Sequence, residues 1–490
     1  MKTYIRLLWA AALSASCITA GQAQTNHSAY FLSDFDYRHE LNPAFDGKRN
    51  YISFPALSNL GFYAGSSVGV SHFLFPTADG QLTTFMNESV DRNEFLDALP
   101  KNIGVNLSLQ ETLLASGFHA WNGFNTVSLG LKSQNFIHLP KGLFSFMKSP
   151  SNSEYLLEDF GASSTNYLEL ALGHSRQIDE HLRVGAKAKI LVGLAKMSMI
   201  IDELSITTQD ERWSVTPKGA HLKFAAKGLT VPTKGETGNY QDNDYELDEN
   251  GQHTGPLKPG TDEQISYEDI DFDAGSLGPT GWGMAFDLGA VYRLNDDWTF
   301  SAALLDLGFL TWKNATEASM KNTFEFDGFR EISVTDDNKG NKLNHQVDQL
   351  VDDLSDLAKF SKDGDNGRLG QGLAATLNLG AEYTLPVYDR LRFGFLSSTH
   401  IQKSNSWTEA RFSANYTPVS IFEMAVNYAV SKFGSSGGVL LNLCTPYAGF
   451  FVGFDAPFTK FEPAYHIPVK RFGMQLNVGI NIHFGKKNEG

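Results

Sequence analysis

The chain has 490 residues, with 40 lysines and arginines against 55 aspartates and glutamates, so its formal net charge is −15. This acidity excludes a typical nucleic-acid-binding protein, which presents a basic face, and a hydrophobic content of 42% with 19% charged residues excludes wholesale disorder. The 36 phenylalanines and 45 glycines, at a mean hydropathy of −0.24, favour many amphipathic strands over a bundle of membrane helices.

Residues 1–23 have the order of a secretory signal peptide. Lys2 and Arg6 are basic, Leu7–Leu13 is apolar, and Gly21-Gln22-Ala23 resembles a cleavage site. We therefore expect an exported protein whose mature chain begins at residue 24. Residues 24–58 then precede the first predicted strand and are expected to form a short plug-like segment.

Alternation of apolar and polar residues is clearest near the end of the chain. Between Phe472 and Phe484 every second residue is apolar, and the residues between them are polar or glycine. Because successive side chains of a strand point to opposite faces, this segment separates two environments. The pattern recurs over 281–294, 371–385 and 420–431, with aromatic residues at the ends of the apolar face. Such long strands are typical of transmembrane barrels.

The same pattern predicts fourteen strands. They lie at 59–75, 102–114, 123–137, 165–176, 181–200, 281–294, 297–310, 371–385, 390–402, 406–417, 420–431, 438–445, 447–455 and 469–484. Short links alternate with long connections, which lie at 76–101, 138–164, 201–280 (acidic) and 311–370 (with a helix at 343–360). Outer-membrane barrels show this asymmetry between short periplasmic turns and long outer loops. We therefore predict an all-β fold, a transmembrane antiparallel barrel of about 14 strands over 59–484, with a charged tail at 485–490.

Two shorter features accompany these strands. Residues 90–99 are expected to form a short helix, and residues 203–231 a further hairpin that extends above the membrane. The helices could gate the pore or dock a partner, and the alternative is that they pack on the rim of their own barrel, because long loops need some core of their own.

The segment Leu41-Asn42-Pro43-Ala44, followed by Tyr51–Leu57 and Asn59–Phe62, resembles an uncharacterised family of Bacteroidota outer-membrane proteins. Its Asn-Pro-Ala step is also similar to FadL-like fatty-acid transporter barrels and to type IX secretion barrels, as is the closing strand Val478–Phe484. The resemblance implies a short luminal plug near Asn42, Pro43 and Ala44, and it supplies no substrate. The alternative for this step is a local turn, in which Pro43 fixes φ and Asn42 supplies a hydrogen bond.

Polar residues at positions predicted to point inward are candidates for lining the lumen. They are Lys187, Lys189, Asp287, Arg293, Glu382, Glu423, Arg471, Gln475, Asn477 and His483. Such groups can tune what passes, or they can pair with each other and fill a closed interior. A single β-bulge would invert these assignments locally.

One candidate metal site lies in the acidic connection. Oxygen-bearing side chains alternate there and could enclose Ca²⁺; they are Asp242, Asp244, Glu246, Asp248 and Asn250. The ligand set of an EF-hand is incomplete, because position twelve from Glu246 is Leu257, so a solvated acidic loop is the alternative. No other cofactor is expected.

The sequence offers no catalytic constellation. Gly65-Ser66-Ser67-Val68-Gly69 fits G-x-S-x-G, but it lies within a predicted strand and not at the strand-to-helix turn which exposes a nucleophilic serine. We therefore predict that the protein is not an enzyme.

These observations predict a porin-like protein of the outer membrane of a Gram-negative bacterium. The expected function is a passive channel or transporter for small molecules, hydrophobic ones among them. The alternative is a structural barrel component of a secretion or surface-assembly complex. Expected partners are outer-membrane lipid and lipopolysaccharide, and no nucleic acid.

Overall fold

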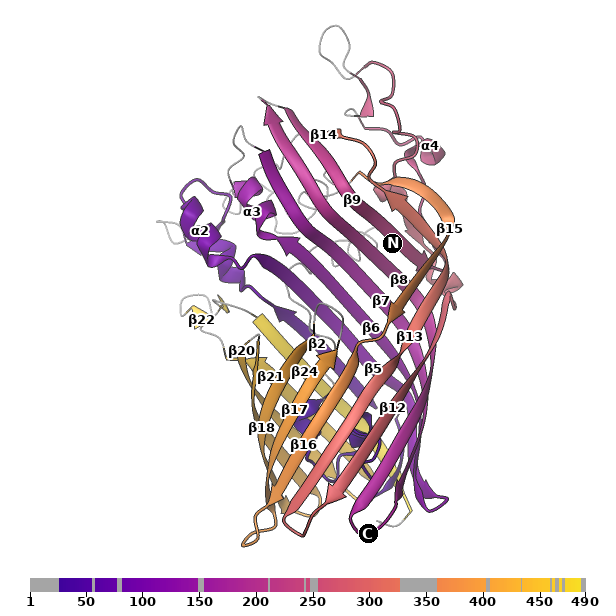
Figure 1. The fold of residues 1–490 in the computed structure, drawn as a ribbon, viewed down its shortest axis with the longest axis vertical. Helices are drawn as coiled ribbons and strands as arrows, with labels where there is room; N and C mark the ends of the chain where they lie inside the picture. The colour runs from indigo at the N-terminus through magenta and orange to yellow at the C-terminus, as the bar shows by residue number, and fades with distance from the viewer. Residues whose placement is uncertain are drawn as a thin grey trace.

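In a computed structural model the chain forms a closed antiparallel β-barrel (Figure 1). The structure describes residues 26–54, 58–76, 82–148, 154–209, 212–241, 244–246, 254–326, 359–401, 406–432, 434–458, 461–462, 467–468 and 472–485. The predicted signal peptide, most of the predicted helix at 343–360, and Arg471 lie outside these residues.

Fourteen positions make up the barrel wall, as predicted. The first position is shared by β1 (Asn50–Ser53) and β2 (Asn59–Ser66), both of which pair with β5 and with β24 and so close the barrel. The following wall strands are β5 (Asn102–Ala120), β6 (Gly123–Pro140), β7 (Glu154–Gln177), β8 (Leu182–Gln209), β12 (Gly281–Arg293), β13 (Trp298–Ser319), β16 (Ala375–Thr384), β17 (Leu391–Ile401), β18 (Trp407–Val419), β19 (Phe422–Ser431), β20 (Gly434–Cys444), β21 (Ala448–Pro457) and β24 (Phe472–Phe484). Closure gives the backbone of every wall strand a partner on both edges.

The outer face of the wall is apolar, as the alternation predicts. On β12, Trp282, Phe286 and Tyr292 are all exposed, whereas Asp287 between them is buried. Trp282 and Tyr292 lie ten residues apart, so at ~3.3 Å per residue and a tilt of ~40° this band is about 25 Å tall. That height matches the apolar band of transmembrane barrels.

One side of the wall rises far above the other (Figure 1). β8 has 28 residues, whereas about 9–11 suffice to cross a bilayer. Above Gly193 the neighbour of β8 changes from β12 to β9 (Arg212–Ala226), whose Ala226 pairs with Ala195. The long connection at 201–280 therefore contains strand in its first part, where a further hairpin at 203–231 was predicted, because the β8–β9 hairpin continues the sheet above the membrane band.

The predicted helical connection at 311–370 also contains strands. β13 continues to Ser319, β14 (Phe324–Phe326) pairs with β9, and β15 (Ser361–Gly372) pairs with the upper part of β13. In contrast, the first predicted strand at 59–75 is too long, since β2 ends at Ser66 and the 3-10 turn η3 (Val70–His72) follows.

Helices and short strands pack around the upper end of the wall. The predicted helix at 90–99 is observed as α2 (Arg92–Ala98), which begins where the Asp91 carboxylate accepts a hydrogen bond from the Glu94 N–H. The other short elements are β3 (Leu74–Pro76), β4 (Leu82–Thr84), α3 (Lys141–Lys148), β10 (Leu229–Thr230), α4 (Lys234–Thr237), η5 (Tyr267–Asp269), β11 (Asp271–Phe272), η6 (Ala274–Ser276), β22 (Phe461–Glu462) and β23 (Ile467–Pro468). Within the described ranges, no helix is both long and apolar enough to cross a membrane.

The largest apolar cluster joins these helices to the inner face of the tall wall. Phe95 of α2 and Phe146 of α3 are each 1% exposed and belong to one core with Ile201 and Leu204 of β8. We call this set the upper core. It covers the inner face of the wall above the membrane band.

Candidate functional site

The N-terminal segment, residues 26–49, lies inside the lower half of the barrel (Figure 1). We call this segment the N-terminal plug. It contains two short 3-10 helices, η1 (His27–Ala29) and η2 (Asp36–Glu40). Its aromatic side chains are buried, with Tyr30, Phe35 and Tyr37 at most 2% exposed, and they form a core with wall residues. Because apolar contacts and polar anchors both hold it, the plug fills the lumen at this level.

A buried ion-pair group anchors the start of the plug. Arg411 of β18 lies 3.0 Å from Glu409 and 3.2 Å from Asp455 of β21. The Ser28 hydroxyl donates a 2.6 Å hydrogen bond to Asp455 and accepts one of 2.9 Å from Arg411. This plug hydroxyl therefore completes a charge network that the wall itself supplies.

A second group anchors the next turn of the plug. The Glu423 carboxylate accepts hydrogen bonds from the Ser33 hydroxyl at 2.8 Å and from the Asp34 N–H at 2.9 Å. Arg392 lies 3.2 Å from Glu423 and 3.2 Å from Glu382. Glu382 and Glu423, both proposed from alternation alone, thus pair with one arginine, and Glu423 also holds the plug.

The Asn42-Pro43-Ala44 turn packs directly on glycines of the wall. The Asn42 side chain accepts from the Ala44 N–H at 2.9 Å and donates to the carbonyls of Ala290 and Ala302. A Cβ atom at Gly185 would lie 2.1 Å from the Pro43 carbonyl oxygen, and one at Gly289 would lie 2.0 Å from Asn42 Oδ1. Such an approach is open only to glycine.

A polar cavity of about 210 Å³ lies above the plug. Its lining combines lysines, carboxylates, amides and hydroxyls from strands on several sides of the barrel, with Glu40 contributed by the plug. The lining includes Asn106, Ser108, Gln110, Lys132, Gln134, Thr165, Glu169, Lys187, Lys189, Asp306, Gln371, Thr376 and His400. We call this space the luminal cavity.

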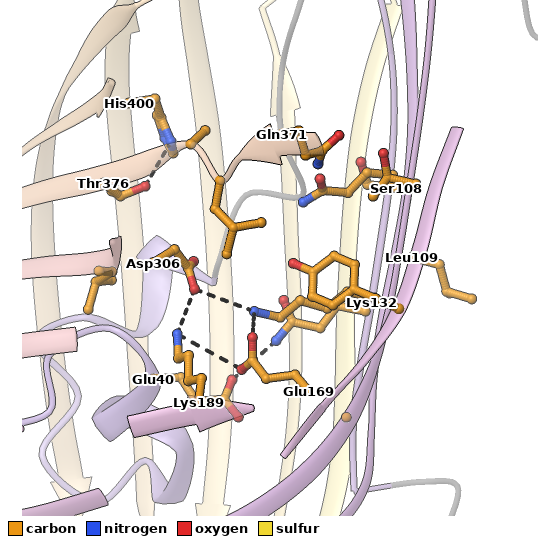
Figure 2. A pocket seen from close by; sticks show the side chains of 18 of the residues that line it. Glu40, Ser108, Leu109, Lys132, Glu169, Lys189, Asp306, Gln371, Thr376 and His400 are labelled. Atoms are coloured by element: carbon orange, nitrogen blue, oxygen red, sulfur yellow. Dashed lines mark hydrogen bonds and ion pairs between the residues drawn. The ribbon is translucent and has the colours of Figure 1, made fainter. Parts of the chain in front are cut away.

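The charged centre of the luminal cavity is built on a β-bulge. The β12–β13 register shifts between Phe286 and Leu288, and Asp306 has a φ of 56°, so that Leu305 and Asp306 both turn inward. Figure 2 shows the result, in which Lys189 lies 2.6 Å from Asp306. Lys189 also lies 2.8 Å from Asp287.

A second lysine extends this group. Lys132 of β6 donates a 2.8 Å hydrogen bond to Glu169 of β7 and lies 3.9 Å from Asp306 (Figure 2). Lys187 and Glu40 also line the cavity here, and Asp287 lies behind Lys189, so three lysines lie among four carboxylates. A solute in the cavity therefore meets charges of both signs and many hydrogen-bonding groups.

Lys187 connects the cavity to the plug. Its ammonium donates to the His39 carbonyl at 3.2 Å and to His39 Nδ1 at 3.3 Å. Because an ammonium only donates, His39 Nδ1 accepts, and Nε2–H faces the Tyr51 hydroxyl at 2.6 Å. Burial, and secondarily the charge of Lys187, hold the pKa of His39 well below its usual range, so this imidazole is neutral.

The remaining candidates from the alternation are dispersed. Gln475 and Asn477 of β24 line a small cavity of about 20 Å³ beside the plug. His483 is buried and lies 2.9 Å from Asp36 of the plug. Arg293 lies at the end of β12 with an exposed side chain. Arg471 is outside the described residues.

Of the five predicted Ca²⁺ ligands, the structure describes Asp244 and Glu246 only. The Asp244 carboxylate binds the Lys234 ammonium at 2.6 Å and accepts from the Gln241 N–H at 2.8 Å. Glu246 is exposed, and its backbone pairs with Pro256 and Gly255. Asp242, Asp248 and Asn250 lie outside the described residues, so the Ca²⁺ site stays a prediction.

Several residues of the site were missed by the sequence reasoning. Lys132, Glu169, Asp306 and Arg411 were not proposed, although each is a charged residue inside an alternating strand. That signal could have identified Lys132, Glu169 and Arg411. Asp306 could not be placed, because strict alternation from Leu305 turns it outward and only the bulge reverses it.

Together these features define a plugged β-barrel with a polar, charged lumen. The chain belongs to the family of unknown function DUF5723, whose model matches residues 43–455. The predicted resemblance to an uncharacterised family is thereby confirmed. No curated protein matches the sequence.

Solved barrels of similar length align with the chain at low identity. The toluene transporter TbuX of Ralstonia pickettii is 11% identical, with 92% of this chain and 95% of that chain covered and a TM-score of 0.42. The toluene transporter TodX of Pseudomonas putida is 11% identical, with coverages of 97% and 96% and a TM-score of 0.39. A FadL homologue of Pseudomonas aeruginosa is 9% identical, with coverages of 97% and 99% and a TM-score of 0.41.

Proposed function

We propose that the protein is an outer-membrane channel for small polar solutes, in which the N-terminal plug closes the periplasmic side of the lumen. Its placement in a membrane is supported by the closed backbone pairing and by the apolar outer band, with Trp282 and Tyr292 at its two ends. The short turns would then face the periplasm and the tall wall the cell exterior.

The observation that carries the proposal is the polar lining of the luminal cavity. Lys132, Lys189, Glu169 and Asp306 converge there among amides and hydroxyls. An apolar solute would remove water from these groups without replacing its hydrogen bonds, which costs several kcal/mol for each charged group (about 2–7 kcal/mol even for a neutral polar one). We therefore assign a polar solute, and not the hydrophobic molecules included in the sequence-based expectation.

Passage requires the plug to move relative to the wall. The plug is held by hydrogen bonds from Ser28 and Ser33 to wall carboxylates that keep their own arginine partners, and by one from Tyr37 to the Asn481 amide. Each such hydrogen bond contributes about 0.5–1.5 kcal/mol. Releasing the plug leaves the Arg392 and Arg411 ion pairs of the wall in place, whereas Lys187 loses its hydrogen bonds to His39.

The test is conductance and liposome swelling with the full-length mature protein. A triple variant, Ser28→Ala, Ser33→Ala and Tyr37→Phe, removes three plug anchors and changes no wall residue. We expect it to open more often and to admit sugars and amino acids faster than the wild type. The matched control is Tyr428→Phe, which removes a hydrogen bond to Ser435 outside the lumen. Absence of conductance and swelling in both the wild type and the folded triple variant would refute the channel.

The height of β7, β8 and β9 favours a second candidate, a barrel component of a surface assembly. β8 extends well beyond a membrane-spanning length, and such a wall offers an outer face to a partner. A stoichiometric protein retained by the native complex, together with no solute passage, would favour this function over the channel.

A further inference from the structure

Three potential metal-ligating side chains meet at the lower end of the barrel, where the plug contacts the wall. Asp36 comes from η2 of the plug, Cys444 from the end of β20 and His483 from the end of β24. One carboxylate oxygen, the thiol sulfur and one imidazole nitrogen lie within 4.8 Å of one another. Cys444 is 3% exposed and His483 is 6% exposed.

The hydrogen bonds of His483 fix which ring nitrogen faces this group. Its Nδ1 lies 2.7 Å from the carbonyl oxygen of Thr445, which can only accept, so Nδ1 carries a hydrogen. In the neutral imidazole, Nε2 then presents a lone pair to Asp36 Oδ2 at 2.9 Å. Two lone pairs at this distance need a cation or a proton between them.

The surroundings match the outer shell of a metal site. A ligating histidine ordinarily donates its other N–H to a carbonyl or carboxylate, and a ligating carboxylate is itself hydrogen-bonded. Here Thr445 accepts from His483, and the Asn481 amide donates to Asp36 at 2.9 Å. The Tyr37 hydroxyl in turn donates to Asn481 at 2.7 Å.

Gly449 of the wall leaves the space in which the side chains of Asp36 and His483 meet. Gly449 of β21 pairs with Cys444 on one side and with Asn481 on the other, so it lies in the same row of the wall. A Cβ atom at Gly449 would lie 2.7 Å from Asp36 Oδ2 and 3.1 Å from His483 Nε2. The wall is thus hollowed where the three ligands converge.

From this geometry we propose that Asp36, Cys444 and His483 bind a zinc ion that fastens the N-terminal plug to the wall. A sulfur, a nitrogen and an oxygen ligand are the set Zn²⁺ accepts, with bonds of about 2.0–2.3 Å and hence roughly 3.3–3.6 Å between tetrahedral ligand atoms. The 2.9 Å between Asp36 Oδ2 and His483 Nε2 is shorter than that range, and all three ligand atoms lie within 4.8 Å of one another, so a small outward shift of these side chains admits the ion. Binding displaces the thiol proton of Cys444, and a water molecule or the second oxygen of Asp36 completes the tetrahedron.

The proposal does not depend on the channel function, because it concerns metal binding by the resting barrel. The probe is Co²⁺, because a thiolate bound to Co²⁺ gives a charge-transfer band in the near ultraviolet. We expect one Co²⁺ per chain, displaced by Zn²⁺, in protein purified in detergent and stripped with a chelator. Cys444→Ser should remove the thiolate band and weaken Zn²⁺ binding by more than about 100-fold. Changes to outer-shell residues typically weaken metal binding by only about 10–100-fold.

Further variants separate binding from folding. Asn481→Ala is expected to weaken Zn²⁺ binding roughly 10-fold through the outer shell, and Gly449→Ala fills the hollow from the wall side. His174→Gln is the control, because His174 lies at the lower end of β7 and contacts Asn125. If a variant does not fold, protection of the wild-type Cys444 thiol from alkylation by Zn²⁺ gives the same answer. No thiolate band and no protection would overturn the proposal, and would show that a proton alone bridges Asp36 and His483.

Discussion

The backbone N–H of Asp306 donates a 2.8 Å hydrogen bond to the carboxylate of Asp287 on the neighbouring strand. This contact forms across the β-bulge, where the normal ladder between β12 and β13 is interrupted. The side chain of each aspartate in addition binds Lys189. The bulge turns the Asp306 carboxylate inward and leaves the Asp306 N–H without a partner in the ladder. The Asp287 carboxylate accepts from this N–H instead.

Replacing Asp306 tests this arrangement. Asp306→Ala removes the 2.6 Å contact to Lys189, and we expect the free energy of unfolding to fall by about 1.5–3 kcal/mol, the range for hydrogen bonds to charged groups. Urea unfolding in detergent, followed by tryptophan fluorescence, measures the change. Asp296→Ala, at an exposed position of the β12–β13 turn, is the control and should stay within about 0.5 kcal/mol of the wild type. Equal stability of both variants would contradict the role assigned to Asp306.

Replacing Lys189 tests the electrostatics of the luminal cavity. Lys189→Met leaves two lysines facing four carboxylates, so the lumen becomes more negative and the channel should favour cations more strongly than the wild type. The measurement is the reversal potential of open channels under a salt gradient. Lys218→Met, on the exposed β8–β9 hairpin, should leave the reversal potential unchanged. A shift of the reversal potential in the opposite direction would rule out this view of the lumen.

Two wall glycines are expected to set the position of the plug turn. Alanine at Gly185 and Gly289 would place Cβ atoms 2.1 Å from the Pro43 carbonyl and 2.0 Å from Asn42 Oδ1. We expect this double variant to retain a folded barrel but to lose hydrogen-exchange protection over residues 38–46. Gly372→Ala is the matched control, because nothing lies within 4 Å of its added Cβ. Unchanged protection in the double variant would mean that the plug turn is not held by this packing.

The upper core should unfold separately from the barrel. Phe95 is 1% exposed, and its ring centroid lies 4.6 Å from that of Phe85. Phe95→Ala should lower the free energy of unfolding of the upper core by about 3–5 kcal/mol, the usual range for replacing a core phenylalanine by alanine. Limited proteolysis should then cut within 82–100, while heat-dependent migration on a gel shows an intact barrel. Leu96→Ala, which is only partly buried, should resist the protease.

The fold could be predicted from the sequence because the wall separates two environments over the height of the apolar outer band. Trp282, Asp287 and Tyr292 alternate in the sequence as they alternate between the two faces of β12. The alternation is less informative above the membrane band, where neither face of β8 meets lipid. The strand was therefore predicted to end near residue 200, and it continues to Gln209.

The sites depended on information that alternation does not contain. Glu382 and Glu423 were proposed as inward from alternation, whereas their shared partner Arg392 follows only from the register of neighbouring strands. The zinc ligands Asp36 and His483 are separated by 447 residues, and no spacing motif joins them. They meet because the plug folds back to the strand that closes the barrel.

The change of neighbour along β8 has a consequence for how the family can vary. The segment between Ala195 and Thr280 leaves the lower wall from β8 and returns to it as β12. These two strands pair with each other below the segment, and β9 pairs with β8 above it. Lengthening or shortening this segment changes the height of the tall wall and leaves the circumference of the barrel unchanged. Length differences among homologues should therefore concentrate in this tall hairpin, where they carry no penalty for closure.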